Sequence, residues 1–246
     1  MDFSKVKIHC SSLGVLFIEP KDKGAKDRGE LSETAKKHLI KIYKEQYWGR
    51  KKQITSKYLE KGTVCEPASI ELISILDDKY YEKNEEQKEN EWITGTPDIV
   101  TETEIQDVKS SFDADTFLPM VIEPLEKMYG YQMQGYMWLW KKELALVRRC
   151  LVNTPESIVN GEKYYLMKKM DVATEESPEY KLAAAEIELN MTFDDIPPEE
   201  RCVTHSVPFS QEIIDKIPGK VQAARDFFKL FYETHMALNK KVGEVV

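Results

Sequence analysis

Three residues in one short stretch of the chain, Asp98, Asp107 and Lys109, have side chains suited to hydrolytic chemistry. The alternation of the stretch 92–111 predicts a β-hairpin, with Asp98 at the end of the first strand and the other two residues on the second. Because strand side chains alternate between faces, Asp107 and Lys109 share a face. Two carboxylates and an ammonium there could hold a hard divalent cation and activate a water, which favours metal-dependent cleavage of a phosphodiester bond.

Magnesium is the cofactor that these residue types favour. Mg²⁺ prefers octahedral oxygen ligation and takes one or two protein carboxylates, with water and phosphate completing the shell. Asp98 and Asp107 would supply the carboxylates, and the backbone carbonyl of Val108 a third oxygen. Lys109 would lie beside the attacking water and steady the charge that develops at phosphorus. We expect one or two Mg²⁺ ions at the site, with Mn²⁺ able to substitute.

The pattern Asp-Val-Lys is common on exposed strands, so its meaning depends on three further residues. Glu66 lies near the start of a predicted helix, 63–76, ahead of the hairpin. Gln132 and Tyr136 lie four residues apart on a second predicted helix, 127–141, and therefore share a face. Each also has a structural interpretation, because an acid at a helix start favours the helix dipole and a polar pair can border a packed helix. Together they favour a hydrolytic site.

The composition indicates a globular protein outside the membrane. The chain has 246 residues, of which 41% are hydrophobic and 32% charged. No apolar run approaches the ~20 residues needed to cross a bilayer, and the start of the chain lacks the apolar region of a signal peptide. We therefore expect a cytoplasmic protein, in the host cytoplasm if it is viral. The four cysteines are scattered without a CxxC pair, so free thiols are expected rather than a zinc or iron–sulfur site.

The charge is unevenly distributed. The chain has a net charge of −8, but the segment 35–62 carries nine basic residues and two acids, a net +7 that leaves −15 for the rest. A local basic surface on an acidic body fits an enzyme that grips nucleic acid at one place, although a solvated helix face is the alternative. Within this segment Arg50, Lys51 and Lys52 are the candidate DNA contacts.

The order of the expected elements predicts an α/β fold with a mixed central β-sheet flanked by helices. We expect a single domain, 1–246, with its core at about 60–155 and a C-terminal strand and long helix packed on that core. The expected elements are a helix from 31 onward, the helix 63–76, the hairpin 92–111, the helix 127–141, a strand at 144–152, a helix at 179–189, a strand at 201–207 and a helix at 211–238 with a possible break at Pro218-Gly219.

These residues, in this order, resemble the PD-(D/E)xK nuclease superfamily. The similarity covers roughly residues 60–140, and the branch it resembles contains RecB-type nucleases, YqaJ-type viral recombinases and the phage lambda exonuclease. The early segment Cys10-Ser-Ser-Leu-Gly14 also resembles the N-terminal serine motif of the YqaJ and lambda branch. The resemblance implies a restriction-endonuclease-like core. It rests on Glu66, Pro97-Asp98, Asp107-Val-Lys109 and Gln132-Met-Gln-Gly-Tyr136.

The resemblance also implies a role for each residue of the motif. Asp98 and Asp107 would be the metal ligands, and Lys109 would be the catalytic lysine. Glu66 would match the upstream helix glutamate that helps bind the metal or order its water. Asp107 stands where the family has Asp or Glu, which shortens the reach to the metal by one methylene.

Four further residues receive roles from the resemblance alone. Gln132 and Tyr136 would match a helix motif beside the site that orients the lysine or contacts DNA. Ser11 or Ser12 would match a serine near the scissile end, where a phosphate contact is the expected role.

The implied function is that of a Mg²⁺-dependent deoxyribonuclease of the exonuclease type. The lambda-like branch implies 5′→3′ digestion of linear duplex DNA in phage-type recombination or end-processing, leaving a single strand for an annealing protein. In that branch the enzyme is a homo-oligomer, a ring-shaped trimer that encloses DNA.

Two alternatives stay open. The first is a CRISPR-adaptation-type nuclease or another RecB-family endonuclease; the former generally carries a four-cysteine iron–sulfur cluster, whose close C-terminal spacing is absent from this sequence. The second is a non-catalytic DNA-binding protein on a nuclease fold. The presence of every acid and of the lysine argues against this alternative.

Overall fold

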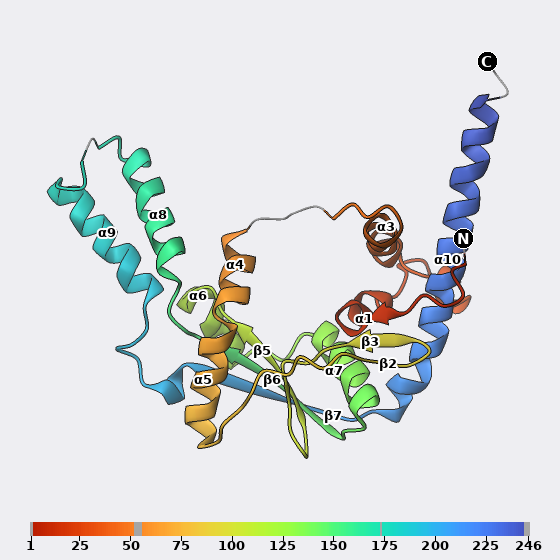
Figure 1. Ribbon diagram of the computed structural model, residues 1–246, viewed down its shortest axis with the longest axis horizontal. Coiled ribbons are helices and arrows are strands. Elements are labelled where there is room, and N and C mark those ends of the chain that lie inside the picture. The colour runs from red at the N-terminus through yellow and green to blue at the C-terminus, as the bar shows by residue number, and fades with distance from the viewer. Residues whose placement is uncertain (1, 52–55, 173, 244–246) are drawn as a thin grey trace.

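The structure, a computed structural model, describes residues 2–51, 56–172 and 174–243 (Figure 1). The strands are β1 (Ile8–His9), β2 (Lys88–Glu89), β3 (Ile93–Gly95), β4 (Ile99–Val100), β5 (Ile105–Ser110), β6 (Leu144–Cys150) and β7 (Cys202–Pro208). The helices are α1 (Cys10–Leu16), α2 (Lys23–Asp27), α3 (Glu33–Tyr47), α4 (Lys57–Val64), α5 (Glu66–Asp77), α6 (Ala114–Phe117), α7 (Lys127–Trp140), α8 (Glu156–Lys169), α9 (Pro178–Met191) and α10 (Gln211–Gly243), with 3-10 turns η1 (Leu118–Val121) and η2 (Pro198–Glu200).

The central sheet has the order β4-β5-β6-β7. Strands β5 and β6 run parallel, whereas the two outer pairings are antiparallel, so the sheet is mixed as the sequence predicted. Parallel neighbours need a crossover connection, and the crossover between β5 and β6 contains α7. This connection lays α7 across the strand that carries the candidate site.

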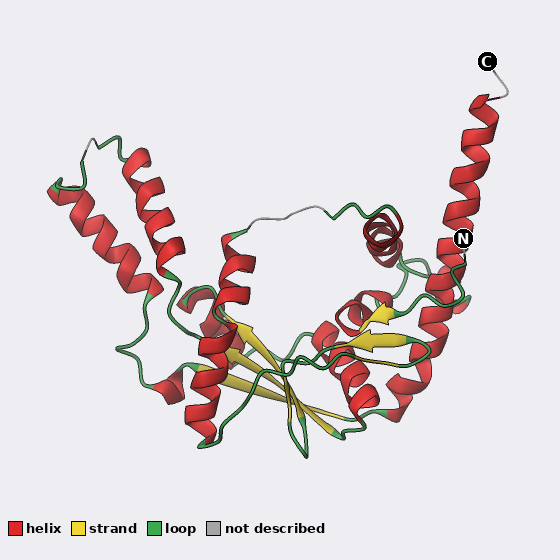
Figure 2. Cartoon of the chain, in the orientation of Figure 1, coloured by secondary structure: helices red, strands yellow, loops and turns green. Residues whose placement is uncertain are grey.

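Helices cover both faces of this sheet (Figure 2). On the α7 face, inward-pointing Ile105 and Val147 pack with Met133 and Met137 of the helix. On the opposite face, Val108 packs with residues of α5 in a second cluster that includes Ile70 and Ile73. Residues of one strand therefore divide by parity, and the parity of Asp107 and Lys109 is that of the α7 face.

The predicted hairpin 92–111 is wrong in its first half. Ile93–Gly95 does not pair with β5 but belongs to a separate three-stranded sheet, β1-β3-β2, in which β1 and β3 are parallel. Only Ile99–Val100 pairs with β5, with Ile99 opposite Gln106. Pro97 stands between the two short strands, and proline cannot donate to a strand ladder. Asp98 thus precedes a strand rather than ending one.

Several elements of the second half of the chain also differ from expectation. Helix α8 was not predicted; with α9 it forms a hairpin that projects from the body at the left of Figure 1. Helix α10 continues through Pro218 without the predicted break. Ile214, Ile217 and Val221 on its inner face are buried, and we infer that their burial outweighs the backbone hydrogen bond lost at the proline. Among the described helices, none is long and apolar enough to cross a membrane.

An arginine–carboxylate pair ties α5 to the sheet. Arg148 of β6 donates two hydrogen bonds to Asp77 at the end of α5, with Nη1–Oδ2 and Nη2–Oδ1 distances of 2.8 and 2.9 Å. The Arg148 side chain is 7% exposed and that of Asp77 26%. The two terminal nitrogens of the planar guanidinium thus form a bidentate pair with Asp77 at the rim of the core, whereas its buried Nε has no hydrogen-bond partner among the described residues.

We expect Asp77→Ala to lower the free energy of unfolding by about 3 kcal/mol, because it leaves the buried Arg148 charge without its partner. Urea denaturation measures this. Glu71→Ala, at an exposed position of the same helix, is the control and should change the value by less than about 0.5 kcal/mol. Equal losses in the two variants would show that the pair does not stabilise the fold.

Candidate active site

The two aspartates face each other at one end of the central sheet. The register that sets Ile99 opposite Gln106 continues one step to set Asp98 opposite Asp107. The backbone N–H of Val108 donates to Asp98 Oδ2 at 2.6 Å, which fixes the Asp98 carboxylate against β5. Asp107 is 1% exposed. The first prediction of the sequence, that these two carboxylates converge, matches this geometry.

Lys109 and Gln132 hold the two oxygens of Asp107. The Lys109 ammonium lies 2.6 Å from Asp107 Oδ2 and 3.4 Å from the carbonyl oxygen of Val108. The amide of Gln132 donates to Asp107 Oδ1 at 3.0 Å and to the hydroxyl of Tyr136 at 3.2 Å. Helix α7 thus presents its Gln-xxx-Tyr face to β5, and the structure brings all five of these residues together.

Glu66 lies at the first turn of α5 and points toward the same end of the sheet. Its Oε1 lies 2.7 Å from the ammonium of Lys83, and its side chain is 18% exposed. The negative charge of Glu66 contributes to raising the pKa of both Asp98 and Asp107, so the three carboxylates lie within electrostatic reach of one another. Glu66 is therefore part of the acidic cluster, while Lys83 is a partner that the sequence did not point out.

This cluster perturbs the titration of its members. Burial, then the charge of Asp107, raises the pKa of Asp98 to about 6. Burial also raises the pKa of Asp107. Burial by itself would lower the pKa of Lys109. The negative charges of Asp107 and Asp98 outweigh the effect of burial, so the pKa of Lys109 is raised. Shifts of this kind, caused by burial together with specific charged partners, are typical of functional sites.

The residues present fit a magnesium ion. Asp107 Oδ2 and Glu66 Oε1 are buried and, within the part of the chain described, accept no well-formed hydrogen bond, although each faces a lysine ammonium. Buried carboxylate oxygens in this state favour a cation. Among the described residues, no three His, Cys, Asp or Glu side chains form a complete metal cluster. Mg²⁺ requires only one or two protein carboxylates beside water and phosphate, so Asp98, Asp107 and the Val108 carbonyl suffice.

Gly95 makes room for the aromatic ring that supports this site. A Cβ at Gly95 would lie 2.6 Å from Cε1 of Tyr136 and 2.8 Å from Sγ of Cys10, closer than a Cβ approaches non-bonded heavy atoms. We expect Gly95→Ala to destabilise the protein by roughly 1–3 kcal/mol, because Tyr136 must move. Thermal unfolding measures this. Gly62→Ala, where a Cβ would meet no atom within 4 Å, is the control, and equal effects would contradict the packing explanation.

The two serines lie on α1, which packs against α7. Ser11 is exposed, and its hydroxyl lies 2.8 Å from Nδ1 of His9. The Ser12 hydroxyl lies 2.9 Å from Nε2 of His38 on α3. The sequence assigned no histidine to the site, because isolated histidines carry no metal-ligand spacing. The contact between Ser12 and His38 joins two distant segments, which a single sequence does not display.

The basic segment divides into exposed and buried parts. Arg50 and Lys51 are exposed after α3, whereas Lys52 lies outside the described residues. Lys61 is fully buried; its ammonium donates to the carbonyl of Phe112 at 2.7 Å. Burial lowers the pKa of Lys61 to about 8. The interpretation of the whole segment as one solvent-facing basic surface is therefore wrong at Lys61, which ties α4 to the loop after β5.

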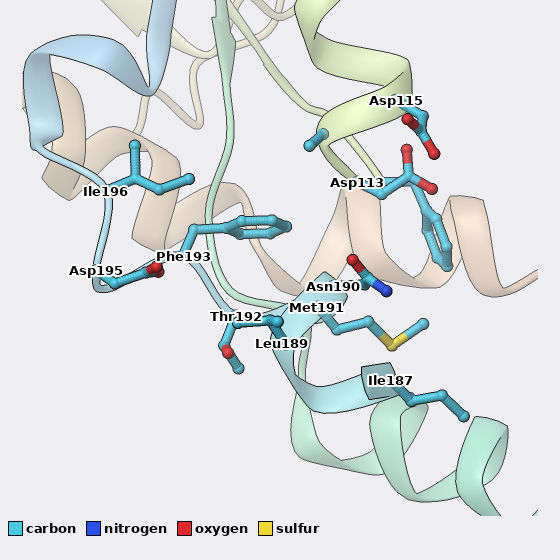
Figure 3. Close-up of a pocket in the computed structure, with 12 residues that line it drawn as sticks. Asp113, Asp115, Ile187, Leu189, Asn190, Met191, Thr192, Phe193, Asp195 and Ile196 are labelled. Carbon is cyan, nitrogen blue, oxygen red and sulfur yellow. The ribbon is translucent and has the colours of Figure 1, made fainter. Parts of the chain in front are cut away.

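A separate pocket of about 430 Å³ lies between that loop and the end of α9 (Figure 3). Asp113 and Asp115 from one side, and Phe193 and Asp195 from the other, contribute to its lining. None of the aspartates of the acidic cluster lines it. Its position at the base of the α8–α9 hairpin sets it apart from the candidate active site.

Solved structures that this chain resembles include exonucleases. The chain is similar to a phage-related exonuclease from Haemophilus somnus 129PT, with 29% identity, 94% of this chain and 97% of that chain covered, and a TM-score of 0.71. It shares its fold with an alkaline exonuclease from Laribacter hongkongensis at 12% identity, with 99% and 96% covered and a TM-score of 0.60. The structure of that enzyme in complex with dAMP also has a TM-score of 0.60, at 11% identity.

No protein-family model matches the sequence, and no curated protein matches it significantly. The structural neighbours and the acidic cluster agree with the resemblance that the sequence alone indicated. The chain resembles the phage exonuclease-like branch of the PD-(D/E)xK nucleases, and the exonucleases among its structural neighbours are consistent with this resemblance.

Proposed function

We propose that the protein is a Mg²⁺-dependent exonuclease that hydrolyses phosphodiester bonds of DNA. The observation that carries this proposal is the convergence of Asp98, Asp107 and Lys109 on one strand end, with a Lys109 Nζ–Asp107 Oδ2 distance of 2.6 Å. The exonucleases of the same fold support the reaction class. Mn²⁺ would substitute for Mg²⁺, because both prefer oxygen ligands.

Asp98, Asp107 and the Val108 carbonyl would hold the metal, with Glu66 binding it or ordering its water. The bound ion would lower the pKa of a water molecule and offset negative charge on the phosphoryl oxygens. Gln132 acts as a positioning residue, since its amide holds Asp107 Oδ1 and leaves Oδ2 directed toward Lys109. Tyr136 in turn holds the Gln132 amide.

Lys109 acts as a cation in this scheme. Its neighbouring carboxylates raise its pKa, so it is protonated at neutral pH and suited to donate hydrogen bonds rather than to accept a proton. Its side chain is 34% exposed, so the ammonium is accessible to substrate. From this position it would orient the attacking water and stabilise the charge that develops at phosphorus.

The finer features follow from the resemblance. We propose digestion of linear duplex DNA from the 5′ end, in phage-type recombination or end-processing, by a homo-oligomer, a trimer as in the lambda-like branch. The single-stranded product would pass to an annealing protein. Ser11, Ser12, Arg50, Lys51 and Lys52 are the proposed DNA contacts outside the catalytic cluster.

One assay tests the function. Wild-type protein with Mg²⁺ should digest linear duplex DNA labelled at either end, leave closed circular DNA intact, and release the 5′ label first. Chelation by EDTA should stop digestion. Cleavage of the circle would indicate an endonuclease, early release of the 3′ label would reverse the polarity, and DNA binding without digestion would favour a non-catalytic protein.

A further inference from the structure

A second basic side chain lies beside Lys109. In the parallel pairing of β5 with β6, the partner of Lys109 is Arg149. Paired residues of neighbouring strands point to the same face of the sheet, so the Arg149 guanidinium belongs to the α7 face together with Asp107 and Lys109.

The Arg149 guanidinium is buried without a matching acceptor. The residue is 8% exposed, and its Nε and Nη2 atoms make no hydrogen bond within the described chain. Arg149 forms an ion pair with Glu126 at the start of α7, with an Nη2–Oε1 distance of 3.5 Å. That glutamate is 60% exposed, so its pairing with Arg149 is a weak surface contact.

The neighbouring arginine differs in its two terminal nitrogens, both of which have a carboxylate partner, although its Nε, like that of Arg149, has no hydrogen-bond partner among the described residues. Arg148 points to the opposite face and forms two short hydrogen bonds with Asp77. Arg149, one residue later, has comparable burial but no bidentate partner. A buried guanidinium is costly unless its hydrogen-bond donors are engaged. A planar anion with two oxygens, such as a phosphate group, matches the fork of Arg149.

One aromatic ring joins the two cations. The Arg149 guanidinium carbon lies 5.0 Å from the ring centroid of Tyr129, and the Lys109 ammonium lies 6.0 Å from the same centroid. Tyr129 belongs to the first turn of α7, just after Glu126. The ring therefore keeps both positive groups on one wall of the site, next to the buried Asp107.

We propose that Arg149 binds a phosphate group of the DNA strand in the active site. Glu126 is the partner of this arginine in the free protein, and the DNA phosphate displaces it. The inference rests on the proposed nuclease function and adds to it a substrate-binding residue. When the strand enters, the phosphate takes the Arg149 donors and Glu126 returns to solvent. The exchange replaces one ion pair of Arg149 by another, and no covalent bond is made or broken.

The test compares three variants, Arg149→Gln, Glu126→Gln and Arg148→Gln. KM and kcat are measured with Mg²⁺ on linear duplex DNA, and DNA affinity is measured in EDTA at several salt concentrations. Arg149→Gln should raise KM by about 10- to 100-fold, the range of a charge-assisted pair, and reduce the slope of log affinity against log salt by about 1. Glu126→Gln should tighten binding a few-fold. Arg148→Gln should lower thermal stability without changing the salt slope.

Each outcome decides a separate point. If wild type digests DNA and a folded Arg149→Gln retains its KM and salt slope, Arg149 is structural and the inference fails while the proposed function stands. If Arg149→Gln does not fold, the Glu126→Gln variant is the test, because Glu126 is exposed. Unchanged DNA affinity in Glu126→Gln then overturns the inference. If wild type neither binds nor digests DNA, the proposed function fails and the inference fails with it.

Discussion

Lys109→Ala should lower the rate of Mg²⁺-dependent DNA digestion by about three orders of magnitude, the effect of removing one preorganised donor from a transition state. The physical reason is the position of the ammonium, 2.6 Å from Asp107 Oδ2 and beside the Val108 carbonyl, where the metal ligands and the attacking water would meet. Single-turnover digestion of end-labelled linear duplex measures the rate of the chemical step directly.

The fold and the binding of DNA should survive this substitution. Lys109 is 34% exposed at its side chain, and Asp107 keeps its hydrogen bond from Gln132. Lys7→Ala is a matched control, because Lys7 also forms a lysine–carboxylate pair, but with Glu89 of β2 in the separate three-stranded sheet. Digestion at the wild-type rate by Lys109→Ala, or an equal loss in Lys7→Ala, would remove Lys109 from the active site. Asp107→Ala should be inactive as well, since it removes a proposed metal ligand.

The sequence anticipated the site better than the elements that carry it. Period-two alternation is local, so the shared face of Asp107 and Lys109 could be inferred without any knowledge of the fold. The helical spacing of Gln132 and Tyr136 likewise predicted that they share a face, and in the structure this face meets β5. The pairing of Ile93–Gly95 with β1 could not be inferred, because strand partners distant in the sequence leave no local pattern.

Arg149 shows which signal was overlooked. Two consecutive arginines in the otherwise apolar strand Leu144–Cys150 must point to opposite faces, one of them toward the face of Asp107. The alternation of side chains along a strand therefore predicts that one of the two arginines lies on the face of Asp107. Which of the two it is depends on the register between β5 and β6, and this register is tertiary information. The ion pair of Glu66 with Lys83 is likewise tertiary information, since no spacing in the sequence predicts it.

Lys61 shows the opposite error. A count of charges assigned it to a basic surface, yet it is buried and held by the carbonyl of Phe112. Its ammonium also lies 5.3 Å from the ring centroid of Phe193, a residue far along the chain. Net charge over a window describes the composition of a segment and not the direction of its side chains, so it overestimates the solvent-facing charge wherever a lysine anchors a loop.

Asp98→Asn should abolish digestion and at the same time stabilise the metal-free protein. The substitution removes a proposed metal ligand, so activity should fall by about three orders of magnitude. Mg²⁺ should also no longer raise the melting temperature as a bound ligand does. In EDTA the variant should melt at a higher temperature than wild type, because it removes one of three clustered carboxylates. The asparagine carbonyl can still accept the hydrogen bond from the Val108 N–H.

The pH dependence of this stabilisation has a definite sign. Burial and the charge of Asp107 raise the pKa of Asp98 to about 6 from an ordinary value of 3.8. The folded wild type therefore binds a proton more tightly than the unfolded chain, and it loses stability as the pH rises from about 4 through 6. Asp98→Asn lacks this loss, so its advantage in EDTA should grow over that interval to on the order of 2 kcal/mol and then level off. Urea denaturation at pH 4.5 and 7.5 measures it, with Asp215→Asn on an exposed turn of α10 as control. An advantage that is absent at pH 7.5, or larger at pH 4.5, would contradict the raised pKa of Asp98 and the burial and carboxylate charge that cause it at the proposed metal site.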